Sequence, residues 1–202
     1  MEHQHNQQNK IAFVLGNGTS RKHLKLNNLQ KFATIYACNA IYREYNPNYL
    51  IAVDVKMINE IVASGYHKTH QVWTNPNKSI ADKTDLQFFS PHKGWSSGPT
   101  ALWFASQNKH KEIYIFGFDY QGINGKFNNV YADTNNYKHS SEPATYFGNW
   151  LNQTVNVINT HNQITYYRVI ETENYIPDVL SRLPNLHHIE YSKISLNFPG
   201  II

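Results

Sequence analysis

Residues 11–20 read IAFVLGNGTS, and this stretch decides the fold. Ile11 to Leu15 is an apolar run of strand length, and Gly16 to Ser20 is a glycine-rich turn. A segment with a helical apolar face follows, and its apolar side chains are Leu24, Leu26, Leu29 and Phe32. A buried strand, a tight turn and a helix in this order are typical of an α/β domain.

Strand-length apolar runs and helical patterns alternate along the rest of the chain. We predict further strands over Thr34–Cys38, Tyr49–Val53, Gln71–Thr74, Leu86–Phe89, Glu112–Phe116 and Thr165–Val169. We predict helices around Met57–Val62 and over Ser97–Gln107 and Tyr146–Thr160, and a short helix with a closing segment within Ile176–Phe198. This alternation predicts a Rossmann-like, doubly wound α/β fold with a mostly parallel sheet.

The chain has 202 residues, of which 41% are hydrophobic, and this suits one domain with a sizeable core. We assign residues 11–202 to a single nucleotide-binding α/β domain. Residues 1–10 are polar and rich in Gln, Asn and His, so we expect a disordered tail there. Residues 121–143 are polar and Asn-rich without periodicity, which is typical of a lid-like loop.

Composition excludes several classes of protein. No run of about 18 apolar residues is present, so we expect no membrane span. The start of the chain lacks the apolar stretch of a secretory signal, which favours a cytoplasmic protein. A single cysteine, Cys38, excludes an intrachain disulfide, and its apolar surroundings favour a buried, inert thiol. The net charge is +4, but the basic residues are scattered, so we expect no nucleic-acid partner.

Polar side chains follow four of the predicted strands at the point where each strand ends. They are Asn17, Asn39, Asp54 and Asp119. In parallel α/β sheets ligands bind beyond the carboxyl ends of the strands, so we expect these four residues at a common site.

Two glycine-containing turns are candidates for phosphate binding. The turn Gly16–Ser20, with Gly18 at its centre, offers conformational freedom and open backbone N–H groups at a helix start. It matches neither a dinucleotide fingerprint nor a Walker A loop, so a plain tight turn is the alternative. Ser97 and Gly98 precede a second helix, where simple capping by Ser97 is the alternative.

Five residues are candidates for catalysis or metal binding. Asp54 and Asp119 could hold a divalent cation, or each could cap a helix or bind nearby backbone. His139 could act as a general base, or be an exposed loop histidine. Tyr120 and Tyr131 flank the same loop, and their phenols could donate to a departing phosphate or merely pack.

Several blocks of this sequence resemble the bacterial sialyltransferases of glycosyltransferase family 42. Residues 11–20 are similar to the family's strand followed by Gly-Asn-Gly-Pro-Ser, and Ala37–Tyr42 (ACNAIY) to its Arg-Cys-Asn-Gln-Phe-Tyr. Lys111–Tyr120 (KEIYIFGFDY) resembles its Lys-Glu-Ile-Tyr-Leu-Ser-Gly-Ile-Asp-Phe-Tyr. Ser97-Gly98 before a helix and His139 ahead of a helix complete the match. More distantly, the chain resembles the 6-hydroxymethylpterin diphosphokinase domain.

The resemblance implies an inverting, metal-independent transferase that uses a CMP-activated sugar and needs no cofactor. The nucleotide would be bound by Gly16, Asn17, Gly18, Ser20, Asn39, Asp54, Ser97, Gly98 and Asp119. His139 would deprotonate the acceptor hydroxyl, and Tyr120 and Tyr131 would stabilise the leaving phosphate. Family members often assemble, so the resemblance also implies a homo-oligomer.

The sequence departs from the family pattern at two of these positions. Asp54 stands where the family has Asn, and Tyr120 aligns with the family's Phe. Our first hypothesis is therefore a glycosyltransferase that transfers a sugar from a nucleotide-activated donor to a hydroxyl acceptor. The alternatives are an ATP- and metal-dependent diphosphokinase-like enzyme, with the metal at Asp54 and Asp119, and a non-catalytic nucleotide-binding protein.

Overall fold

The apolar runs pair into one eight-stranded sheet in which every ladder is parallel. The computed structural model describes residues 10–202, so the predicted tail, apart from Lys10, lies outside the described residues. The strands are β1 (Ile11–Leu15), β2 (Thr34–Cys38), β3 (Tyr49–Ile51), β4 (Val72–Thr74), β5 (Gln87–Phe88), β6 (Glu112–Phe116), β7 (Thr165–Ile170) and β8 (Leu186–Glu190).

The order of the strands is β5-β4-β3-β2-β1-β6-β7-β8. The chain therefore builds outward from β1 to β5 and then returns to the other side of β1 with β6. This confirms the predicted doubly wound α/β fold. The order reverses between β1 and β6, and such a switch point is where open parallel sheets bind ligands.

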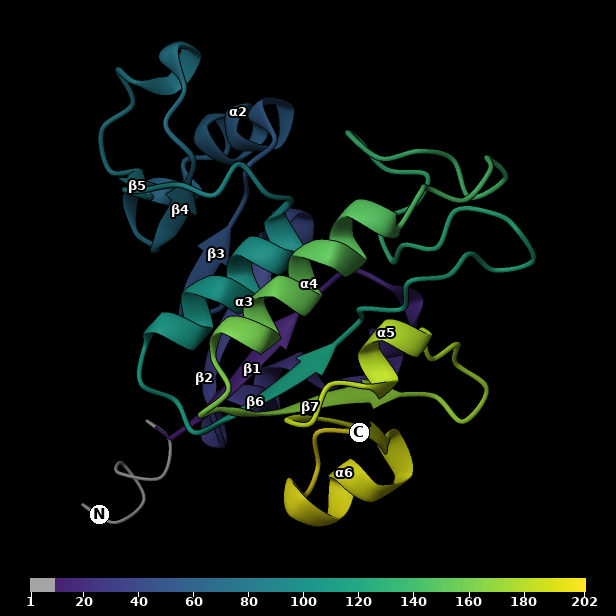
Figure 1. Cartoon of the computed structure of the whole chain (residues 1–202). Helices are drawn as coiled ribbons and strands as arrows, with labels where there is room; N and C mark the ends of the chain where they lie inside the picture. Colours follow the sequence, from purple (N-terminus) through teal and green to yellow (C-terminus); the bar gives the residue numbers. More distant parts are fainter. Residues whose placement is uncertain (1–9) are drawn as a thin grey trace.

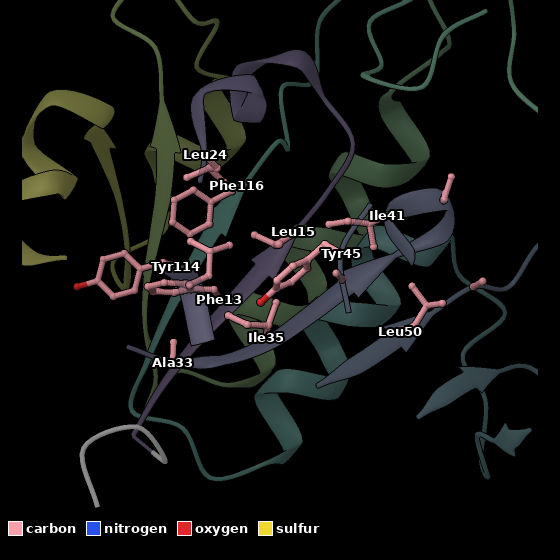
Figure 2. Close-up of a cluster of buried hydrophobic side chains, with 14 of the residues drawn as sticks. Phe13, Leu15, Leu24, Ala33, Ile35, Ile41, Tyr45, Leu50, Tyr114 and Phe116 are labelled. Carbon is pink, nitrogen blue, oxygen red and sulfur yellow. The ribbon is translucent and has the colours of Figure 1, made fainter. Parts of the chain in front are cut away.

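Both faces of the sheet are buried. Successive side chains of a strand point to opposite faces, so one strand contributes to both buried clusters. Phe13 and Leu15 of β1 belong to one buried cluster, and Ala12 and Val14 belong to the other. Figure 2 shows the first cluster, in which Phe13 and Leu15 lie beside Phe116. Continuous apolar strands are typical of a sheet that is covered on two sides.

Helices cover these two faces. The α-helices are α2 (Val55–Ala63), α3 (Ser97–Gln107), α4 (Gly148–Thr160), α5 (Asp178–Ser181) and α6 (Tyr191–Asn197). Helices α3 and α4 run side by side over one face, and α6 packs on the cluster of the other (Figure 1). Within residues 10–202, no helix is long and apolar enough to cross a membrane.

Two expectations about secondary structure are wrong. The segment after the glycine-rich turn forms two 3-10 helices, Thr19–His23 and Leu26–Lys31, in place of an α-helix. Its apolar residues are still spaced to reach the core, but Asn27 and Asn28 favour turns over α-helix. The last strand is β8 and not β7. Its sequence, LHHIE, lacks the apolar run of the inner strands because it forms the edge of the sheet.

The predicted lid-like loop, residues 121–143, contains no helix or strand. Its only regular pairings are isolated bridges between Ile123 and Lys126 and between Lys126 and Pro143. The loop lies beyond the carboxyl ends of β1 and β6 (Figure 1).

The close approach of Gly16 and Gly117 generates a stability prediction. Gly117 has a φ of +68°, and a Cβ atom there would lie 2.9 Å from the carbonyl oxygen of Gly16. Gly125 has a φ of +74° but nothing within 4 Å of the same position. Both Gly117→Ala and Gly125→Ala incur about 1–2 kcal/mol for the left-handed backbone.

Gly117→Ala should lose a further ~1–3 kcal/mol, because the backbone at Gly16 must move. Urea denaturation of the two variants measures the difference. Equal losses of stability in the two variants would mean that the turns at Gly16 and Gly117 can move apart without a cost in free energy.

Candidate nucleotide site at the switch point

A cavity opens where β1 and β6 end, at the switch point of the sheet. It is lined by Gly16, Asn17, Gly18, Cys38, Asn39, Ser96, Ser97, Gly98, Pro99, Gly117, Phe118, Asp119, Tyr120, Gln121, Asn128, Asn129, Phe147 and Trp150. Its volume is about 130 Å³. Sites for drug-sized ligands typically measure roughly 300–1,000 Å³. The cavity is therefore smaller than such a site, and a ligand of that size would extend into its open mouth.

The glycine-rich turn presents fewer free amides than its sequence predicts. The N–H groups of Gly16 and Gly18 donate to the carbonyl oxygens of Phe116 and Gly117 at 2.8 and 2.9 Å. Those of Thr19 and Ser20 donate to the side chains of Asn128 and Asp119. The prediction of several open N–H groups here is thus wrong, because the turn uses them to bind the segment that follows β6.

Asp119 is the centre of this attachment. Its carboxylate accepts hydrogen bonds from the Ser20 backbone and hydroxyl and from the Asn128 amide. It is buried, and a Cβ atom on Gly18 would lie 2.5 Å from it. Any side chain at position 18 would therefore collide with the protein before it reached a ligand. Ser20 is also buried and bound to Asp119, and it does not line the cavity.

Two helix N-termini supply the free amides that the turn lacks. Ser96 is the N-cap of α3, one residue earlier than predicted, and its N–H donates to Gln153. The N–H groups of Ser97 and Gly98 have no acceptor among the described residues, as expected for a first helical turn. The N-terminus of α4 lies at the same cavity, through Phe147 and Trp150. Two positive helix ends thus face one cavity, which favours an anion there.

Aromatic side chains form a wall of the cavity, and Tyr120 is one of them. Its hydroxyl donates to Thr154 Oγ1 at 2.7 Å, and burial raises the pKa of Tyr120. Phe118, Phe147 and Trp150 complete the wall. The Tyr120 phenol is therefore already engaged, and the wall offers flat apolar surfaces for a base or a sugar ring.

Arg168 lies behind this wall and is buried within β7. Its guanidinium donates to the carbonyl oxygens of Phe118, Asp119 and Tyr175, and it stacks over the Tyr120 ring. Burial lowers the pKa of Arg168. Arg168 fixes the backbone that forms the cavity wall, and it adds positive charge beneath it.

The two asparagines at the strand ends have different roles. The Asn17 side chain is engaged, since its amide donates to the Cys38 carbonyl and the Tyr137 hydroxyl and its oxygen accepts from Arg21. Asn39 has a φ of +57°, and its buried Oδ1 has no partner among the described residues. Burial raises the pKa of Cys38 to about 12, so its thiol is inert as predicted.

Besides Ser20, three further predicted site residues do not line the cavity. Asp54 caps α2 by accepting from the Lys56 N–H. The Tyr131 hydroxyl bonds to Glu44 and Arg21, and burial raises the pKa of Tyr131. Within residues 10–202, no group of three His, Cys, Asp or Glu side chains could hold a metal ion.

His139 is the third of them and is 73% exposed. Its Nδ1 atom lies 3.0 Å from Asp133 Oδ1. The turn that contains it is joined to the cavity wall, because the Phe127 N–H donates to the Glu142 carbonyl and Asn128 comes next in the chain.

Sequence reasoning missed several residues of this site, among them Asn128, Trp150 and Arg168. A lone arginine inside the apolar strand TYYRVI was a usable signal, because a buried charge requires partners. Asn128 and Trp150 carried no comparable signal, since Asn is abundant in the loop and aromatic residues are common in helices.

Comparisons with solved structures support a sialyltransferase-like fold. The sialyltransferase CstII from Campylobacter jejuni, in complex with cytidine-5'-monophosphate, has a TM-score of 0.55 and 15% identity, with 96% of this chain and 98% of that chain covered. The same enzyme with the substrate analogue CMP-3FNeuAc gives a TM-score of 0.54 at 15% identity, with 96% and 100% covered.

The monofunctional alpha-2,3-sialyltransferase Cst-I from Campylobacter jejuni has a TM-score of 0.51 and 11% identity, with 96% of this chain and 80% of that chain covered. No family model matches the sequence. No curated protein matches it either. These likenesses show the fold, and they agree with the sialyltransferase part of the predicted resemblance.

The role of Asn128 is testable with Asn128→Asp. The substitution removes the amide that donates to Asp119 Oδ2 at 3.0 Å and places a second carboxylate there. At neutral pH the variant should lose about 2–3 kcal/mol, because a buried hydrogen bond is replaced by like-charge repulsion.

The two carboxyls would share a proton, so the folded-state pKa of one would be raised. The loss should therefore be smallest below pH ~4 and grow as the pH rises through that raised pKa. Urea denaturation between pH 4 and 8 measures this. Asn129→Asp is the matched control, since Asn129 also lines the cavity and keeps its acceptor for Tyr131. A pH-independent loss in Asn128→Asp would contradict the predicted coupling.

Proposed function

We propose that this protein is a glycosyltransferase that takes a sugar from a CMP-linked donor and transfers it to a hydroxyl acceptor. The observation that carries the proposal is the cavity at the switch point, where the N-termini of α3 and α4 converge. An anionic, flat, partly apolar ligand such as a nucleoside monophosphate group suits this combination of amides and aromatic walls. The likeness to sialyltransferases crystallised with CMP supports the choice of nucleotide.

In this proposal the phosphate binds at the free N–H groups of Ser97 and Gly98. The only carboxylate among the cavity residues, Asp119, is bound to Ser20 and Asn128, and Asp54 caps α2. Both Asp119 oxygens already accept hydrogen bonds, and Asp54 does not line the cavity, so we propose that binding needs no metal. The helix ends take over the charge stabilisation that a cation would provide.

The reaction would be a single displacement with inversion. The acceptor oxygen attacks the anomeric carbon, the bond from that carbon to the CMP phosphate oxygen breaks, and His139 takes the hydroxyl proton. Tyr120 and Tyr131 are bonded to Thr154 and Glu44, so the leaving phosphate is stabilised by the helix N-termini in their place.

One observation favours the second candidate, a nucleotide-binding protein without catalysis. The titratable side chains that line the cavity are Cys38, Asp119 and Tyr120. Burial raises the pKa of Cys38 and of Tyr120, and the Asp119 carboxylate is occupied by hydrogen bonds from Ser20 and Asn128. The cavity itself therefore offers no base, which is what a protein without catalysis would show. In a transferase the base must come from outside the lining residues, and we assign that part to His139 on the adjoining loop.

Thermal stabilisation by added nucleotides tests whether the protein binds CMP. We expect CMP to stabilise the protein by about 2.7 kcal/mol at a concentration 100 times its Kd. This shifts the melting temperature by a few degrees. The shift should be the same with Mg²⁺ and with a chelator. A shift with ATP that requires Mg²⁺, and none with CMP, would support the diphosphokinase-like alternative.

The rate of sugar transfer tests whether His139 is the general base. His139→Ala should lower the rate of transfer from CMP-N-acetylneuraminic acid to lactose by roughly 10²–10⁴-fold while the Kd for CMP stays unchanged. His23→Ala is the matched control, because His23 is 70% exposed and also lies near a carboxylate, that of Glu171. Equal rates in the two variants would remove His139 from the mechanism. Nucleotide binding without transfer by the unaltered protein would favour the non-catalytic candidate.

A further inference from the structure

A short, closed turn holds the His139 imidazole against a carboxylate. His139 Nδ1 lies 3.0 Å from Asp133 Oδ1, and the Ser140 N–H donates to the same oxygen at 3.0 Å. The Glu142 carboxylate accepts from the His139 N–H at 2.8 Å, and the Asp133 N–H donates to the Lys138 carbonyl. The backbone on both sides of the histidine is thus fixed by its own neighbours.

The partner of Nδ1 decides which ring nitrogen carries the proton. The backbone hydrogen bond from Ser140 lowers the pKa of Asp133, so this carboxyl is ionised at neutral pH. An ionised carboxylate only accepts hydrogen bonds, so Nδ1 must be the donor of the pair. In the neutral imidazole Nε2 then keeps its lone pair, which is the form that a general base requires.

The turn is attached to the cavity wall at Asn17 and is also held by the side chain of Arg43. The Val130 N–H donates to the carbonyl of Asn17, and the Arg43 guanidinium donates to Thr134 Oγ1 and to the Asn135 carbonyl. The Asp133 backbone has a φ of +67°, a conformation that a non-glycine residue adopts only where its surroundings hold it. The pair is therefore held in a defined position beside the cavity.

We propose that Asp133 is a positioning residue for the transfer reaction: it holds the His139 imidazole with Nδ1 as donor and leaves Nε2 free to take the acceptor proton. This inference rests on the proposed function, because it assigns Asp133 its part through His139. The sequence around Asp133 does not predict this positioning role, because Asp133 and His139 lie six residues apart in a loop without periodicity.

The ring tautomer of His139 tests the arrangement without any activity. We would record two-bond ¹H–¹⁵N spectra of the full chain with ¹⁵N-labelled histidine at pH 8, where an unperturbed imidazole is neutral, and assign His139 with His139→Gln. We expect the Nδ1–H form in the unaltered protein. In Asp133→Asn the amide can donate to Nδ1, so the Nε2–H form should gain population. A His139 ring that is mainly Nε2–H before the substitution overturns the proposal.

The steady-state constants kcat and KM test whether Asp133 contributes to the transfer reaction through His139. Asp133→Asn should lower kcat for transfer from CMP-N-acetylneuraminic acid to lactose by roughly 10–100-fold and leave the KM for the donor unchanged. Glu171→Gln is the matched control, because it also removes a carboxylate that lies beside an exposed histidine. Glu171 Oε1 lies 3.9 Å from His23 Nε2, and neither residue belongs to the loop. It should change neither value. An unchanged kcat in Asp133→Asn overturns the positioning role.

The two experiments separate the inference from the proposed function. An Nδ1–H ring that responds to Asp133→Asn, in a protein that binds CMP but transfers no sugar, would overturn the proposed function and with it the catalytic part of Asp133. A His139 ring that does not respond, in a protein that does transfer sugar, would overturn the inference alone.

Discussion

The site depends on the contact between the two turns that leave β1 and β6. Gly16 and Gly18 donate backbone hydrogen bonds across it, and no larger residue fits, since a Cβ atom on Gly16, Gly18 or Gly117 would meet backbone or side-chain atoms within 3.0 Å. Asp119 then ties the first turn to Asn128 of the long loop. Because the sheet reverses its order at this point, the contact closes the floor of the cavity while leaving its sides to the helices.

This constraint moves the anion-binding capacity away from the glycine-rich turn. An amide that holds a neighbouring chain segment cannot also bind a phosphate, and four of the turn's N–H groups are engaged in this way. The first turns of α3 and α4 keep their N–H groups free, and Arg168 adds a buried positive charge behind the wall between them. The glycine-rich motif that identifies the site in the sequence therefore forms part of the cavity wall, while the free amides lie in the first turns of α3 and α4.

Residue patterns predicted the strands from β1 to β7, the doubly wound parallel sheet and the long loop, because buried parallel strands are continuous apolar runs. They failed at β8, an edge strand with two histidines, and at the 3-10 helices that follow the first turn. Eight of the twelve candidate residues line the cavity, because the ends of β1, β2 and β6 and the start of α3 meet there. Ser20, Asp54, Tyr131 and His139 do not, because their positions depend on side-chain partners that no local pattern encodes.

The proposed reaction requires a base, and the loop of residues 121–143 carries the candidate, His139, outside the cavity. Its first part supplies Gln121, Asn128 and Asn129 to the wall, and its later part carries the Asp133–His139 pair. The hydrogen bond from Phe127 to Glu142 joins the two parts, so the cavity wall and the imidazole belong to one hydrogen-bonded unit. In the proposed reaction, an acceptor at the cavity mouth would meet His139, and the exposure of this side chain to solvent would give a second substrate access to it.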